Sequence, residues 1–92
     1  MLNDTIKELR QNRGISQVTL ATALGVTKQS VSNWENDNIQ PSIEMLVKIA
    51  KFFSVSTDYL LGLTEKESID VTGLNSTQIT HLRLIIEDLQ QL

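Results

Sequence analysis

Apolar residues recur along most of the chain at spacings of three and four, the period of an amphipathic α-helix. In residues 2–12, Leu2, Ile6 and Leu9 lie on one helical face, and Gly14 follows where such a helix ends. Further segments with this spacing follow at residues 16–24, 42–53 and 57–61. The expected apolar stripe of residues 42–53 consists of Ile43, Leu46, Ile49, Ala50 and Phe53. No stretch alternates apolar and polar residues as a half-buried strand does. The pattern therefore predicts an all-α fold built from short helices.

Two of these helices are joined by a very short turn, and the rest of the chain is organised around this pair. Ser16 and Thr27 are good N-cap residues, because a side-chain hydroxyl can accept from the free N–H groups of a first helical turn. Gly25 lies where a helix C-cap favours positive φ, and Val26 supplies an apolar side chain to the turn. Residues 16–35 therefore predict a helix, a tight turn and a second helix.

The second helix of the pair has one polar face and one apolar face. At about 100° per residue, four hydrogen-bonding side chains fall within one arc of roughly 140°: Lys28, Gln29, Ser32 and Asn33. Val31 and Trp34 fall on the opposite side. An ordinary solvated surface helix could show this composition. A polar face without a carboxylate also suits the acceptor-rich major groove of DNA, and the helix–turn–helix spacing favours that interpretation.

The order of residues over a longer stretch resembles a known family. The matching features are Ser16-Gln17, Ala21, Gly25-Val26, Val31-Ser32, Trp34-Glu35, Pro41-Ser42, Ile49-Ala50, Val55-Ser56, Asp58 and Leu60-Leu61-Gly62. They resemble the XRE-type helix-turn-helix family of phage repressors, Cro proteins and related bacterial transcriptional regulators. The resemblance extends from Met1 to about Leu63. It implies a five-helix repressor-like domain that binds double-stranded operator DNA at palindromic half-sites.

The resemblance also implies roles for individual residues. Base edges would be contacted by Lys28, Gln29, Ser32 and Asn33, of which Gln29 and Asn33 carry amides that suit adenine. DNA phosphates would be contacted by Gln17, Ser30, Asn36, Asn38 and Gln40. In this family a basic residue of the first helix pairs with the Glu after the recognition helix, which here implies an ion pair between Arg10 and Glu35.

Charge is divided unevenly between the two parts of the chain. Residues 1–63 hold six basic and six acidic side chains, whereas residues 64–92 hold two basic and five acidic ones. The net charge of −3 therefore belongs entirely to the second part. A DNA-binding domain without excess positive charge is unusual, and no Arg lies in the loop of residues 36–41. We expect weak phosphate anchoring, with backbone N–H groups supplying part of it.

A polar stretch, residues 64–73, separates the resembled domain from a last helical segment, residues 74–92. Ser76 is the expected N-cap of a helix of about sixteen residues. Its apolar stripe consists of Ile79, Leu82, Ile86 and Leu89, widened by Ile85 and Leu92, and Leu84 points away from it. The three expected parts are a DNA-binding domain (1–63), a linker (64–73) and a C-terminal amphipathic helix (74–92).

The stripe predicts a partner for the last helix. Against a second copy, the helix would bury about 600 Å² of apolar surface per chain, and we expect a homodimer through residues 79, 82, 85, 86 and 89. The alternative is an antitoxin or antagonist-binding regulator, whose last helix captures a toxin or another protein.

Other functions find little support in the composition. There is no Cys, so disulfides and thiolate metal sites are excluded, and His81 is the only histidine. We expect no catalytic site, metal or cofactor, and no signal peptide or membrane span. The sequence predicts a cytoplasmic, dimeric repressor of phage or mobile-element type.

Overall fold

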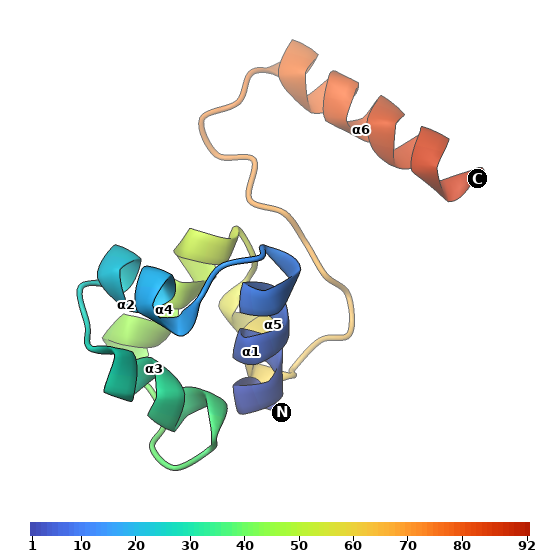
Figure 1. Cartoon of the computed structure of the whole chain (residues 1–92). Helices are drawn as coiled ribbons and strands as arrows, with labels where there is room; N and C mark the ends of the chain where they lie inside the picture. Colours follow the sequence, from blue (N-terminus) through green and yellow to red (C-terminus); the bar gives the residue numbers. More distant parts are fainter.

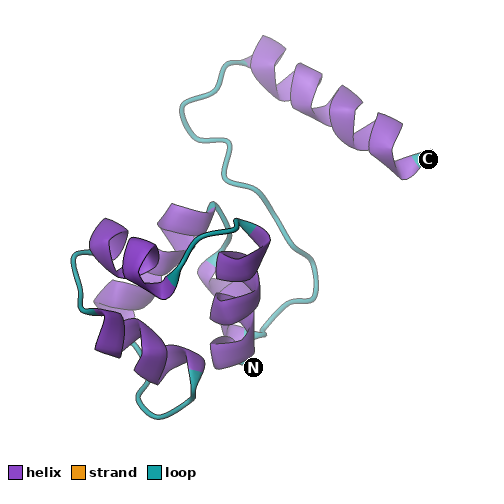
Figure 2. Cartoon of the chain, viewed as in Figure 1, coloured by secondary structure: helices purple, strands orange, loops and turns teal.

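The computed structural model describes all 92 residues, and they form six α-helices without any strand. Figure 2 shows this all-helical architecture, which confirms the expected fold class. The helices are α1 (Leu2–Asn12), α2 (Gln17–Leu24), α3 (Lys28–Glu35), α4 (Ile43–Phe53), α5 (Thr57–Leu61) and α6 (Ser76–Gln90). None of these helices is long and apolar enough to cross a membrane.

Except at α1, the helix starts are fixed by side chains that accept from backbone N–H groups three residues further on. The oxygens of Ser16, Thr27, Ser42 and Ser56 do this at 3.0–3.1 Å, so those predicted N-caps are confirmed. The N-cap expected at Ser76 is wrong, because Asn75 caps α6. Asn75 Oδ1 accepts from the Gln78 N–H at 2.8 Å, and Gln78 Oε1 accepts from the Asn75 N–H at 3.1 Å. This reciprocal capping box explains why the helix starts at that residue.

The first five helices pack together, as Figure 1 shows. They enclose one apolar core. Its buried members are Ile6, Leu20, Ala21, Leu24, Val31, Trp34, Ile49, Ala50, Phe53 and Leu60. Val31 and Trp34 are thus core residues, as the apolar face of α3 predicts. Ile43 departs from the predicted stripe and is 83% exposed, because it lies in the first turn of α4 and at the edge of the buried face.

The turn between α2 and α3 depends on a left-handed residue. Gly25 has φ 73° and ψ 31°, and its N–H points to the carbonyls of Ala21 and Thr22. The next N–H, that of Val26, donates to the Ala21 carbonyl at 2.9 Å, and the Val26 side chain packs against the core. This C-cap ends α2 abruptly and lets α3 begin three residues later.

The segment between α5 and α6 leaves the domain along the end of α4. The Asp70 N–H donates to the Ser54 carbonyl at 3.3 Å, and the Asp70 carboxylate accepts from the Thr72 N–H at 2.9 Å. The hydrogen bonds from Thr72 lower the pKa of Asp70 below its usual value. Beyond this point α6 stands apart from the five-helix domain (Figure 1), and none of its residues is buried.

Candidate nucleic-acid interface

Helix α3 carries the candidate contact residues on the face turned away from the core. Lys28 and Gln29 are exposed, and Ser32 and Asn33 are half-buried. On its other face Val31 and Trp34 are buried. The structure therefore brings the four expected base-contacting residues together on one accessible side of one helix.

Two of these side chains, those of Gln29 and Asn33, are hydrogen-bonded to each other. Gln29 Nε2 donates to Asn33 Oδ1 at 3.1 Å, across one helical turn. A second bond of the same spacing runs from Asn36 Nδ2 to Ser32 Oγ at 3.2 Å. Each amide keeps further donors and acceptors free, since Asn and Gln each carry two N–H donors and one carbonyl oxygen. The polar face therefore combines hydrogen bonds within the helix with donors and acceptors that remain free.

The residues expected at phosphates fall into three places. Gln17 is the first residue of α2, Ser30 lies on α3, and Asn36, Asn38 and Gln40 lie after α3 and are exposed. Ser30 is half-buried, and its hydroxyl lies 3.1 Å from that of Thr27. Most of the residues expected at phosphates thus carry a neutral amide side chain. Lys28 is the one basic side chain on that helix.

Below the polar face, a buried ion pair ties α1 to the end of α3. Arg10 Nε donates to Glu35 Oε2 at 2.6 Å, and Arg10 Nη2 donates to Glu35 Oε1 at 2.9 Å. The side chains are only 12% and 2% exposed. The ion pair expected between these residues is therefore present, in the two-pronged geometry that suits a guanidinium and a carboxylate.

The same ion pair reaches the other helix of the motif. Arg10 Nη1 donates to the Ile15 carbonyl at 2.8 Å, and Gln17 Nε2 donates to Glu35 Oε1 at 3.1 Å. The hydrogen bonds to Glu35 raise the pKa of Arg10 above its usual value, although burial opposes this shift. The bond from Gln17 is a contact that the sequence did not predict. Residues 17 and 35 belong to different helices, and no spacing rule relates them.

Comparison with known proteins agrees with this geometry. The helix-turn-helix family model matches residues 6–60. The chain is 37% identical over 73 residues to the HTH-type transcriptional regulator ImmR of Bacillus subtilis, covering 79% of this chain and 58% of ImmR. It is 34% identical over 67 residues to YonR, an SPbeta prophage-derived, uncharacterised HTH-type transcriptional regulator of the same organism, covering 73% of this chain and 62% of YonR.

A solved structure shows the same fold. The P22 c2 repressor in complex with a synthetic operator superposes with a TM-score of 0.63 at 30% identity, covering 65% of this chain and 91% of the repressor chain. The protein therefore has the helix-turn-helix fold that this repressor domain also has. More particularly, it belongs to the helix-turn-helix family whose members include these transcriptional regulators. It spans about three-fifths of the length of the two curated relatives.

Proposed function

We propose that this protein is a dimeric, sequence-specific DNA-binding regulator, a repressor of phage or mobile-element type that works in the cytoplasm. The observation that carries the proposal is the outer face of α3. It offers Lys28, Gln29, Ser32 and Asn33 without a carboxylate among them, on a helix held rigidly by its buried face. The likeness to a repressor bound to operator DNA and to a prophage-derived regulator supports it.

In this proposal residues on the outer face of α3 contact bases, and residues mostly around α3 contact phosphates. Gln29 and Asn33 contact base edges, with Lys28 and Ser32 beside them. Gln17, Ser30, Asn36, Asn38 and Gln40 contact phosphates. Gln17 keeps one amide hydrogen for a phosphate while the other binds Glu35. Glu35 thereby orients a phosphate-contacting side chain at the N-terminus of α2.

Operator binding by point variants tests this division. The protein's preferred DNA sequence is first obtained by selection from a random pool. We expect Gln29→Ala and Asn33→Ala each to lose about 1–3 kcal/mol on that sequence and to relax the preference at one position per half-site. Gln17→Ala should weaken binding to all sequences by similar factors, because a phosphate carries no base identity.

Gln11→Ala is a matched control, since it removes the same kind of neutral amide from an exposed residue on α1 rather than α3. It should bind the selected sequence like the wild type. Wild-type affinity and preference in both the Gln29 and the Asn33 variants would contradict the proposed recognition face.

We further propose that α6 makes the dimer through Ile79, Leu82, Ile85, Ile86 and Leu89. Four of these side chains are 37–61% exposed in the single chain: Leu82, Ile85, Ile86 and Leu89. Two recognition helices about 34 Å apart read two half-sites on one side of the duplex, so a dimer binds far better than one domain. The alternative occupant of this stripe is a protein antagonist or toxin.

One substitution and its control test the dimer. Ile86→Asp places a charge inside the stripe, whereas Leu84→Asp places the same charge on the same helix but outside the stripe. We expect sedimentation to show a folded monomer with weak operator binding for Ile86→Asp, and a dimer for Leu84→Asp. A wild-type chain that stays monomeric would contradict the dimer and favour a different protein partner.

A further inference from the structure

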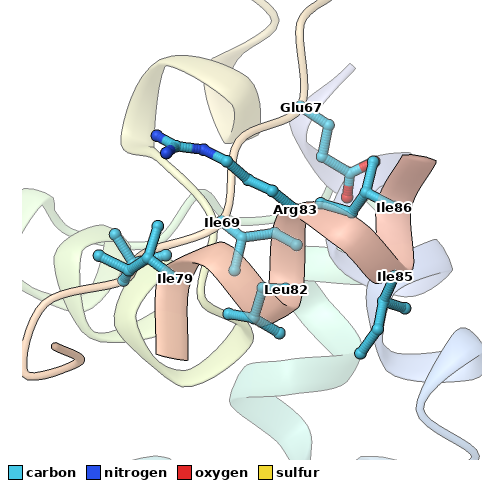
Figure 3. Close-up of a pocket in the computed structure, with 8 residues that line it drawn as sticks. Glu67, Ile69, Ile79, Leu82, Arg83, Ile85 and Ile86 are labelled. Atoms are coloured by element: carbon cyan, nitrogen blue, oxygen red, sulfur yellow. The ribbon is translucent and has the colours of Figure 1, made fainter. Parts of the chain in front are cut away.

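The segment before α6 is more than a polar connection. A hollow of about 470 Å³ lies between this segment and α6, as Figure 3 shows. Its apolar lining comes from both sides: Ile69 and Val71 from the segment, and Ile79, Leu82, Ile85 and Ile86 from α6. Ile69 points toward the helix in Figure 3. We call residues 67–71 together with the lining residues of α6 the composite groove.

Nothing in the single chain fills the composite groove. Ile69 is 64% exposed, Ile85 is 55% exposed and Ile86 is 42% exposed. Large exposed aliphatic side chains on two facing segments form a contiguous apolar patch, which is the usual mark of an interaction surface. The patch also differs from the stripe on α6 alone, because two of its members precede the helix.

The composite groove carries one acidic and one basic residue. Glu67 and Arg83 both line it, and neither forms an ion pair within the chain. In Figure 3 the guanidinium of Arg83 and the carboxylate of Glu67 extend toward opposite sides. An interface with two-fold symmetry requires a patch that is complementary to itself. A patch with one unpaired acid and one unpaired base meets the charge part of that requirement, because each chain offers both signs.

The surface area that a stable dimer buries also favours an interface larger than the stripe of α6 alone. The stripe of α6 alone supplies about 600 Å² per chain, whereas standard interfaces bury roughly 800 Å² per partner. Ile69 and Val71 enlarge the apolar surface beside α6.

We propose that the composite groove binds the same groove of a second copy, with Glu67 of each chain facing Arg83 of the other. This inference rests on the dimer proposed above and assigns residues 67–71 to its interface. Since the Asp70 N–H also bonds to Ser54 of the domain, the interface would end close to the DNA-binding domain and limit how the two recognition helices separate.

Charge exchange on the full chain tests the proposal. We expect Glu67→Arg and Arg83→Glu each to raise the dissociation constant of the dimer roughly tenfold or more, because like charges would then face each other. The double variant Glu67→Arg/Arg83→Glu should return to within about threefold of the wild type. Sedimentation equilibrium at one fixed ionic strength measures all four proteins.

Glu65→Arg is the matched control, since it makes the same charge change two residues away and Glu65 does not line the groove. It should leave the dissociation constant within about threefold of the wild type. Equal effects of Glu65→Arg and Glu67→Arg, or no recovery in the double variant, would overturn the composite groove. If Ile86→Asp still disrupts the dimer in that case, the interface consists of α6 alone. A wild-type chain that is monomeric would overturn both the composite groove and the α6 dimer.

Discussion

At the scale of single residues, the pair of Arg10 and Glu35 connects α1 to α3 and, through Gln17, to α2. Glu35 is the only charged residue among the buried ones, and all its partners are hydrogen-bond donors. Taking two charges out of water costs free energy that their attraction only roughly offsets. The pair is therefore better understood as fixing the positions of α1, α2 and α3 than as a large net source of stability.

Substituting one or both residues of the Arg10–Glu35 pair tests how much the pair contributes to stability. We expect Arg10→Met to lower the free energy of unfolding by about 3 kcal/mol, because it leaves a carboxylate that is 2% exposed without its positive partner. The double variant Arg10→Met/Glu35→Met should be less affected than Arg10→Met, since no buried charge remains. Urea unfolding measures both. A loss below about 1 kcal/mol in Arg10→Met would mean that the pair behaves like an exposed one.

The pKa of Arg10 decides how this contribution depends on pH. Since the folded state raises that pKa, the arginine's share of the stability is fully present below its unfolded pKa. It is lost only as the pH rises through the folded value. Titration of Arg10 therefore leaves the pair intact throughout the neutral range.

At the scale of elements, the ends of the helices are set by left-handed residues as much as by N-caps. Gly25 ends α2 with φ 73°, and Ser54 ends α4 with φ 55°. Only glycine adopts this conformation without strain, and other residues lose roughly 1–2 kcal/mol there. A Cβ on Gly25 would meet no atom within 4 Å, so the strain at that position is purely conformational.

Opposite substitutions at these two sites should therefore have opposite effects. We expect Gly25→Ala to lower the free energy of unfolding by about 1 kcal/mol and Ser54→Gly to raise it by about 0.5 kcal/mol, after the entropy gained by the unfolded chain is subtracted. Thermal unfolding compares each with the wild type. A stabilising Gly25→Ala would contradict the left-handed cap.

Much of this level of structure could be predicted from the chain itself. The caps at Ser16, Thr27, Ser42 and Ser56 are local hydrogen bonds, so residue type and spacing predict them. The same reasoning chose Ser76 in place of its neighbour Asn75, because both residue types are good N-caps. Burial depends on neighbours that spacing does not specify, which explains why Ile43 was wrongly assigned to the apolar face of α4. The composite groove was missed for a similar reason. Ile69 and Val71 stand in a polar stretch, and only the path of the chain places them beside α6.

At the scale of the whole molecule, the distribution of charge determines the ionic contribution to the proposed DNA binding. The five-helix domain has no net charge, and the negative charge lies in residues 64–92. Electrostatic affinity for DNA comes from positive side chains that displace counterions. Amides supply most of the candidate contacts here, and they contribute little to that term.

The salt dependence of DNA binding should show how few ionic contacts the protein makes. We expect a plot of log binding constant against log salt to have a slope of about −4 to −5, corresponding to four to six phosphates per dimer. Asn38→Lys adds one positive charge per chain after α3 and should steepen the slope by about 2 per dimer. A wild-type slope near −8 or steeper would contradict the small number of ionic contacts.

The lack of net charge on the five-helix domain also affects how much of the protein is bound to non-specific DNA in a cell. Chromosomal DNA offers roughly a million or more competing positions to any DNA-binding protein, and attraction to them is almost entirely ionic. We expect a domain with six basic and six acidic residues to bind such positions only weakly. We expect most copies to stay free and to find their site by repeated encounters from solution rather than by sliding. Fewer copies per cell would then be bound to DNA outside the operator.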